Sequence, residues 1–340
     1  MHRFVGPVAL VALASLFQGT FGLGMKYTRP LAWEAWWLVY SVSAMLLLPI
    51  VCTFALIPNF GASIATSPLH VLWKGILYGF LWGVGGILFG KSVERVGMAL
   101  TYGIVMGLAA SVGSLIPLFS EYTAASQRAL SWIVIGNMLM LGGVALSSWA
   151  GIRREKLTGD KVEWESGTGT IRLGLVLAIL SGLLSALLNV GFAASQPIAA
   201  RAVALGSSLR NASLSAWVVV LFGAFLMNAG YSSVLLTING TWATFGMKRT
   251  RRAWQWAVAS GLLWFAALAI YGQGAALMGS LGPVIGWPIL LGLSLIVSSG
   301  FAAYTGEWKG APSAMRWMSF AVFLLLIAVC CLSYGSRVNQ

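Results

Sequence analysis

Ten long apolar stretches, separated by short polar segments, make up most of the chain of 340 residues. Each stretch is about 20 residues long, the length an α-helix needs to cross the hydrocarbon core of a bilayer. Strands of a membrane barrel would instead alternate polar and apolar residues over about 10 positions. The pattern therefore predicts ten membrane-spanning helices, over residues 4–25, 35–57, 69–90, 97–119, 130–150, 172–195, 212–237, 254–277, 283–304 and 317–335.

One pattern occurs twice in these stretches, at an offset of 182 residues. The first copy is Gly79-Phe80-Leu81-Trp82, then Phe89-Gly90 and Gly97, and the second is Gly261-Leu262-Leu263-Trp264, then Tyr271-Gly272 and Gly279. The offset places the third predicted helix on the eighth, so each half holds five helices. An odd number per half gives the halves opposite orientations in the membrane, as in the inverted repeats of secondary transporters.

We therefore expect an all-α membrane protein with ten transmembrane helices in a 5+5 inverted repeat. The first repeat should cover residues 1–150 and the second residues 172–340. Residues 151–171 between them should form a cytoplasmic connecting loop, because residues 151–170 hold four basic and four acidic residues. A central cavity between the halves should be lined largely by the third, fourth, eighth and ninth helices.

Composition agrees with a membrane protein. Hydrophobic residues make up 59% of the chain and charged residues 9%, whereas a soluble domain carries about 25% charged residues. The first residues, Met1-His2-Arg3 before an apolar run, are also compatible with a signal peptide. The run continues to Met25, which favours a retained span.

The net charge of +13 predicts the orientation of the chain and not a nucleic-acid partner, because the basic residues are spread over many short loops. The loops after the odd-numbered helices hold fifteen of them: Lys26, Arg29, Lys91, Arg95, Arg153, Arg154, Lys156, Lys161, Arg172, Lys248, Arg249, Arg251, Arg252, Lys309 and Arg316. The opposite side holds six: Arg3, Lys74, Arg128, Arg201, Arg210 and Arg337. Since Lys and Arg gather on the cytoplasmic side of the inner membrane, both termini should face the periplasm.

The repeated tryptophans are the first candidates for a substrate site. Trp82 and Trp264 are equivalent in the two copies, and substrates of inverted-repeat carriers bind near the midplane, where the repeats meet. An indole can stack on a sugar ring and donate its N–H to a hydroxyl. Packing in the core or against lipid is the alternative.

Polar side chains within the spans are the second set of candidates. A polar group in the bilayer needs a partner, which is another helix, water or substrate. Contact with substrate and an interhelical hydrogen bond are both open for Gln18, Asn189, Asn228 and Gln273, with Tyr102 and Gln196 nearer the span ends.

None of the eight acidic residues lies in the centre of a predicted span. Glu34, at the start of the second helix and downstream of Lys26, comes closest and is the candidate for proton coupling. The alternative is that Glu34 pairs with Lys26 or compensates the dipole at the helix N-terminus.

Other classes of site have no support in the sequence. Cys52, Cys330 and Cys331 lie within apolar runs, and the histidines are His2 and His70, so no metal-ligand spacing or disulfide framework is present. The sequence also lacks a phosphate-binding loop and a hydrolase motif. We expect neither enzymatic activity nor a cofactor, and the oligomeric state is open.

Several short motifs resemble the L-rhamnose–proton symporter family, a branch of the drug/metabolite transporter superfamily. They are Lys26 with Trp33-Glu34-Ala35-Trp36-Trp37, Leu56-Ile57-Pro58-Asn59-Phe60, Leu81-Trp82-Gly83-Val84-Gly85, Gly97-Met98, Asn228 and Glu307-Trp308-Lys309-Gly310. The resemblance implies import of a small sugar, L-rhamnose above all, with a proton. A metabolite or drug exporter of the same superfamily and a polytopic membrane enzyme are the alternatives.

Overall fold

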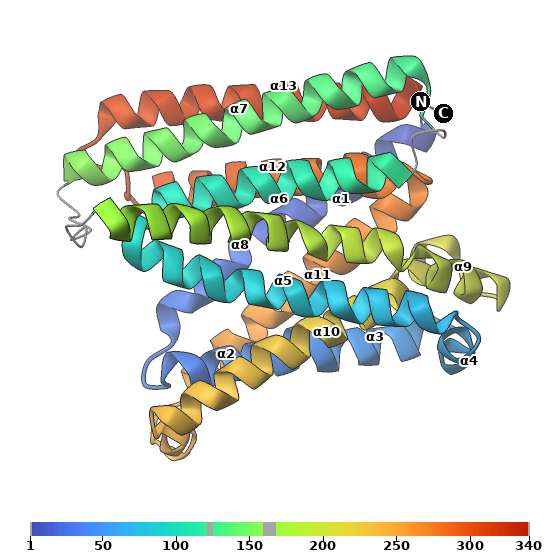
Figure 1. Ribbon diagram of the computed structural model, residues 1–340, viewed down its shortest axis with the longest axis horizontal. Helices are drawn as coiled ribbons and strands as arrows, with labels where there is room; N and C mark the ends of the chain where they lie inside the picture. The colour runs from blue at the N-terminus through green and yellow to red at the C-terminus, as the bar shows by residue number, and fades with distance from the viewer. Residues whose placement is uncertain (1, 121–124, 159–167, 339–340) are drawn as a thin grey trace.

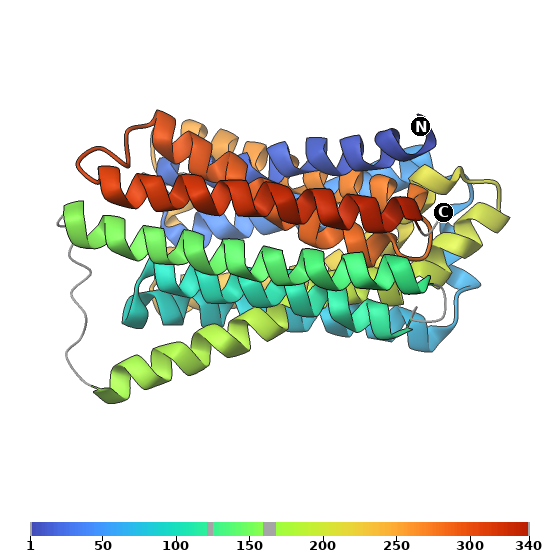
Figure 2. The same cartoon turned by 90° about the horizontal axis from the view of Figure 1, so that it is seen from above.

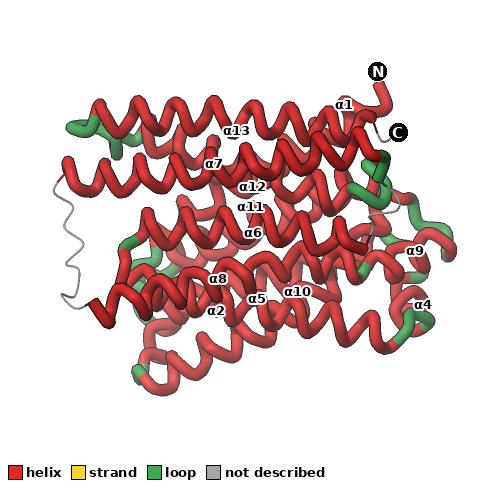
Figure 3. Tube along the Cα trace, turned by 45° about the horizontal axis from the view of Figure 1, so that its top comes forward, coloured by secondary structure: helices red, strands yellow, loops and turns green. Residues whose placement is uncertain are grey.

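The computed structural model describes residues 2–120, 125–158 and 168–338, and the side chains of all of these except residues 2–5, 26, 168 and 169. All regular elements in these ranges are helical (Figure 3). They are α1 (His2–Thr20), η1 (Phe21–Tyr27), α2 (Trp33–Ser41), η2 (Val42–Leu47), α3 (Leu48–Leu56), α4 (Phe60–Ala65), α5 (Leu69–Val96), α6 (Met98–Ser120), α7 (Gln127–Thr158), α8 (Thr168–Ala194), α9 (Gln196–Ala204), α10 (Leu209–Ile238), η4 (Thr241–Gly246), α11 (Arg251–Leu277), α12 (Gly282–Tyr304) and α13 (Pro312–Val338).

The prediction of ten membrane spans is confirmed. Ten segments of the described chain are long and apolar enough to cross a bilayer, and each coincides with a predicted one. They lie side by side along the long axis of the molecule (Figure 1). The chain begins and ends at the same end of the bundle, together with α4 and α9 (Figures 1 and 2). We call this end the termini face and the other end the opposite face.

The fifth span is longer than expected. The prediction ended it at residue 150, but α7 continues to Thr158. Charged residues end an apolar run without ending a helix, because Arg, Lys and Glu are good helix formers. The predicted loop at 151–171 is therefore helical up to residue 158, α8 begins at Thr168, and residues 159–167 lie outside the described ranges.

The second span is interrupted by a π-helix, η2, which the apolar pattern did not predict. Pro49 follows η2 and has no N–H to donate, and its ring crowds the carbonyl four residues before it. The backbone hydrogen bonds there span five residues instead of four: the N–H of Leu48 donates to the carbonyl of Ser43.

Some contacts of the first five spans have parallels among the last five. The helix α5 packs against α8 and α10, and α11, which carries the second copy of the sequence pattern, packs against α1 and the α2–η2–α3 span. Likewise α6 packs on α8, and α12 packs on α1. Equivalent spans of the two halves also pack on each other, with α7 along α13 and α6 against α12 (Figure 1).

Two pairs of the repeated glycines, 79 with 261 and 97 with 279, have similar surroundings, whereas a Cβ on Gly90 would have no neighbour within 4 Å and one on Gly272 would meet Trp217. A Cβ on Gly79 would overlap the backbone carbonyl oxygen of Val220 in α10, and one on Gly261 would overlap Ser43 Oγ in η2. Gly97 and Gly279 have φ angles of 82° and 77°, in the left-handed region that favours glycine. Each ends its helix before the next one begins.

Gly97 is also the whole connection between α5 and α6. Beside it, the hydroxyl of Ser92 lies 2.9 Å from that of Thr101 and donates to the carbonyl of Gly174 at 2.9 Å. The helices α5, α6 and α8 are therefore fastened together at the opposite face.

Two glycine substitutions in α5 test the close packing of this helix. Gly79→Ala should lower the free energy of unfolding by about 1–3 kcal/mol, because its new methyl group meets backbone that cannot move aside. Gly86→Ala is the matched control, because a Cβ there has no neighbour within 4 Å. It should leave stability unchanged or raise it by up to about 1 kcal/mol through helix propensity. Denaturant unfolding in detergent measures both, and equal effects would contradict the packing described here.

Candidate functional site

A cavity of about 590 Å³ enters the bundle from the termini face. The first turns of α5, α10 and α12 and the last turns of α6, α8 and α11 surround it, and α9 covers one side. The four helices that were expected to line a central cavity, α5, α6, α11 and α12, all contribute to it. The volume falls within the range of about 300–1,000 Å³ that is typical of small-molecule sites.

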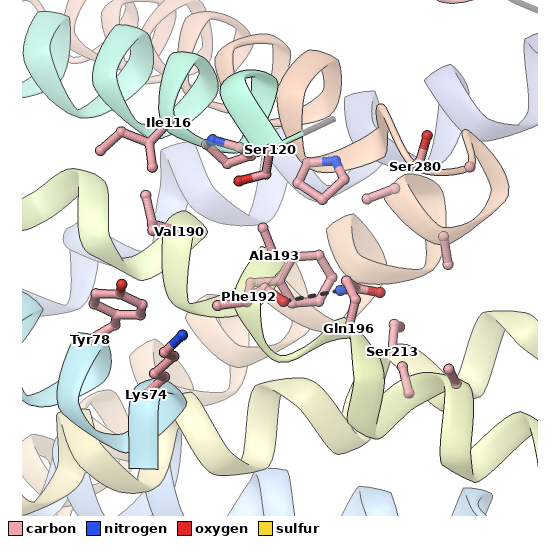
Figure 4. Close-up of a pocket in the computed structure, with 18 of the residues that line it drawn as sticks. Lys74, Tyr78, Ile116, Ser120, Val190, Phe192, Ala193, Gln196, Ser213 and Ser280 are labelled. Carbon is pink, nitrogen blue, oxygen red and sulfur yellow. Dashed lines mark hydrogen bonds between the residues drawn. The ribbon is translucent and has the colours of Figure 1, made fainter. Parts of the chain in front are cut away.

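The cavity has polar and apolar walls (Figure 4). Lys74 and Tyr78 come from α5, and Gln196 comes from the start of α9 on the other side. Ile116 and Val190 form an apolar wall between α6 and α8. An amphipathic small molecule can satisfy its hydroxyls on one side and bury its carbon skeleton on the other.

Lys74 is one of the six basic residues that the sequence assigns to the termini side, and it was not predicted to line a site. The signal was present, because an ionisable side chain within an apolar span marks a functional site by default. It was overlooked because charge counting assigns a lysine near a span end to the adjacent loop. Gln196, which was named as a candidate, does line the cavity.

Trp82 and Trp264 stack on each other. Their ring centroids are 5.5 Å apart and their planes differ by 25°. Trp82 is half-buried and Trp264 is 3% exposed. Neither lines the cavity, but Trp82 lies one helical turn deeper than Tyr78 on the same face of α5. The pair therefore joins the two halves beyond the inner end of the cavity.

Further aromatic rings continue this packing toward the opposite face. Tyr40 lies 6.1 Å from Trp264 and 4.8 Å from Trp37, measured between ring centroids. The indole N–H of Trp37 donates to Asn228 Oδ1 at 3.0 Å, and Asn228 Nδ2 donates to the carbonyl of Ala224. Asn228 thus ties α10 to α2 through the aromatic cluster.

Asn189 connects four helices. Its Nδ2 donates to the carbonyls of Gly113 at 2.8 Å and Pro283 at 2.9 Å, and its Oδ1 accepts from the hydroxyl of Tyr271 at 2.6 Å. The residue is 0% exposed. Both N–H donors of the Asn189 amide bond to other helices of the protein. Its contacts are therefore those of an interhelical hydrogen-bonding residue and not those of a residue that contacts substrate.

The other three polar candidates are dispersed. Gln273 Oε1 accepts from Arg210 at the termini face, at 2.9 Å. Gln18 lies in α1, and its buried Oε1 has no hydrogen-bond partner among the described residues. Tyr102 lines a separate space of about 160 Å³ near the opposite face, beside Arg154 and Trp308. None of the three lines the main cavity.

Glu34 lies at the opposite face and is 8% exposed. Its Oε1 accepts hydrogen bonds from Thr241 Oγ1 at 2.6 Å and from Asn239 Nδ2 at 3.0 Å. These partners follow α10, so Glu34 joins the start of α2 to the second half of the chain. Lys26, its expected partner, lies in η1, and its side chain is outside the described set.

A second set of contacts joins the halves at the opposite face. Tyr27 stacks on Trp256 with centroids 4.7 Å apart, and the guanidinium of Arg252 lies 5.0 Å from the Tyr27 ring. A shallow hollow of about 740 Å³ on this face is lined only by residues 249–259, so it lies along α11 and not between the halves. The larger cavity therefore opens at the termini face, whereas the opposite face holds cross-links between the halves and the smaller space beside Tyr102.

A bundle of ten apolar spans, with a cavity that opens to one face and stops at packed rings, defines a polytopic helical carrier. Comparison with known proteins gives the family. The model of the L-rhamnose-proton symport protein (RhaT) family matches residues 8–336. The chain therefore belongs to this family, which is one of transporters and not of enzymes.

Three curated relatives match along most of their length. An L-rhamnose-proton symporter of Cronobacter sakazakii is 27% identical over 341 residues, which cover 96% of this chain and 95% of the relative. One of Escherichia coli is 26% identical over 308 residues, covering 88% and 87%. One of Pectobacterium atrosepticum is 24% identical over 348 residues, covering 99% and 97%.

The stacked tryptophans give a prediction for a double-mutant cycle. Trp82→Ala and Trp264→Ala should each destabilise the protein, and their costs should fall short of additivity by about 0.5–1.5 kcal/mol, the coupling of an aromatic pair. Trp73→Ala combined with Trp264→Ala is the control, because Trp73 is 62% exposed on α5. That pair should be additive. Additivity for Trp82 and Trp264 in equilibrium unfolding would contradict a stabilising stack.

Proposed function

We propose that this protein imports a small sugar, L-rhamnose above all, together with a proton by alternating access. Membership of the L-rhamnose-proton symport protein family over residues 8–336 is the observation that carries the proposal. The cavity that enters from the termini face supports it, because alternating access requires states that expose a site to one side at a time. The walls of the cavity suit a deoxy sugar, which carries both hydroxyls and an apolar methyl group.

The two halves act, in this proposal, as inverted repeats that rock against each other. The matched packing of α5 and α11, and the matched glycines at 79 and 261 and at 97 and 279, support the repeat. The stacked Trp82 and Trp264 lie where the halves meet. For either indole to stack on a sugar, the rings must first separate, so their contact with substrate belongs to a later step of the cycle.

The termini face is, in this proposal, the periplasmic side. The excess of Lys and Arg in loops of the opposite face supports this orientation. The state described here then receives substrate from outside. A reporter that is active only in the cytoplasm, fused after Gln340, should give no signal, and a strong signal would reverse the orientation.

Uptake of radiolabelled L-rhamnose into proteoliposomes tests the proposed function. With an inward proton gradient, the internal concentration should rise above the external one. With the gradient collapsed by an uncoupler, uptake should stop at equality. Absence of both accumulation and exchange in folded protein would reject the proposal, and accumulation without a gradient would reject proton coupling.

The same vesicles test the proposed role of Glu34 in proton coupling. Glu34→Gln keeps the shape of the side chain and removes its charge. A proton carrier must gain and lose a proton in each cycle, so this variant should lose accumulation and keep exchange of internal for external sugar. Accumulation at the wild-type level would reject Glu34 as the carrier. Loss of exchange as well would assign Glu34 to the cross-link with Thr241 and Asn239.

A further inference from the structure

The position of Lys74 along α5 places it in the lining of the cavity. Lys74, Tyr78 and Trp82 follow one another at intervals of four residues and so share one face of the helix. The first two line the cavity, and the third meets Trp264 beyond it. Lys74 therefore lies on the path from the mouth of the cavity to the contact between the halves.

The ammonium group of Lys74 has no counter-ion in the described structure. The described ion pairs are Arg95 with Glu94 and Arg154 with Glu307, both near the opposite face. No described carboxylate lines the cavity. Three charged N–H donors thus point into a space that is large enough for a ligand. Lys74 is exposed and lies near the start of α5, and an ionisable side chain of a membrane span that faces a cavity marks a binding or transport path.

Gln196 provides a complementary acceptor on the other side of the cavity. Its Nε2 donates to the carbonyl of Phe192 at 3.1 Å (Figure 4). This bond holds the amide in one orientation, while its Oε1 makes no hydrogen bond among the described residues. A ligand between α5 and α9 would therefore meet donors from Lys74, a hydroxyl from Tyr78 and an oriented acceptor from Gln196.

We propose that Lys74 anchors the substrate in the outer cavity by donating charge-assisted hydrogen bonds to adjacent hydroxyls of a sugar. Tyr78 and Gln196 complete the polar side of the site, and Ile116 and Val190 receive the apolar edge of the ring. Charge-assisted hydrogen bonds are roughly twice as strong as neutral ones, so Lys74 contributes most. This assignment rests on the proposed function, because it takes the ligand to be a neutral sugar.

Equilibrium binding of L-rhamnose to the purified full-length protein tests the assignment. Lys74→Met removes the donors and keeps the length of the side chain, and it should raise the Kd at least tenfold. Tyr78→Phe removes one hydroxyl and should raise it about threefold or more. Lys74→Arg keeps the charge and donors and should bind more tightly than Lys74→Met. Lys91→Met is the matched control, because Lys91 is also exposed but lies at the other end of α5, outside the cavity, and its Kd should equal the wild-type value.

The outcomes separate this assignment from the proposed function. If wild-type protein binds L-rhamnose and Lys74→Met binds it within twofold of wild type, the assignment is overturned and the proposed function stands. If wild-type protein binds the corresponding sugar acid, L-rhamnonate, and not L-rhamnose, the neutral substrate is rejected. Lys74 then keeps its role as anchor only if Lys74→Met loses the acid. A denaturation midpoint in detergent, measured for each variant, confirms that the compared proteins are folded.

Discussion

The close approach of α5 to α10 and of α11 to η2 is the constraint on which the interior of this protein depends. Apolar side chains gain little from leaving lipid for a protein interior, so helices in a bilayer associate largely through backbone contact at small residues. Gly79 and Gly261 allow that contact at equivalent positions of the two halves. Three residues further along each helix, Trp82 and Trp264 reach each other across the molecule. A side chain at either glycine would separate the halves where the rings stack.

Most polar groups of the interior serve the architecture. Asn189 joins α8 to α6, α11 and α12, Asn228 joins α10 to α2, and Glu34 is held by residues that follow α10. Such groups pair with each other because lipid offers no alternative. In the cavity, by contrast, Lys74 and Gln196 present polar atoms to an open space and not to a neighbouring helix. Polar groups that face an open space beside an apolar wall distinguish a place for a ligand from ordinary helix packing.

The spans and their number followed from the sequence because an apolar run of fixed length has few structural solutions in a bilayer. The π-helix before Pro49 and the extension of α7 to Thr158 did not, since both depend on backbone hydrogen bonding that hydropathy does not describe. For the site, the sequence identified the equivalence of Trp82 and Trp264 and the inclusion of Gln196. The sequence did not show that Asn189 is an interhelical hydrogen-bonding residue and not a ligand-binding amide. Both N–H donors of Asn189 bond to carbonyls of helices that are distant in sequence, and such contacts are visible only in three dimensions.

The connection between α5 and α6 consists of the single residue Gly97, and this limits how α5 can move. Hydrogen bonds among Ser92, Thr101 and Gly174 hold α5, α6 and α8 together next to Gly97. Gly97 is therefore a pivot point at the end of α5 that is far from the mouth of the cavity. With 28 residues, α5 is about 42 Å long at 1.5 Å per residue. A tilt of only about 5° at this pivot point therefore displaces its far end by about 4 Å. In the proposed transport cycle, a tilt of α5 too small to break a hydrogen bond at one surface would therefore open or narrow the passage at the other.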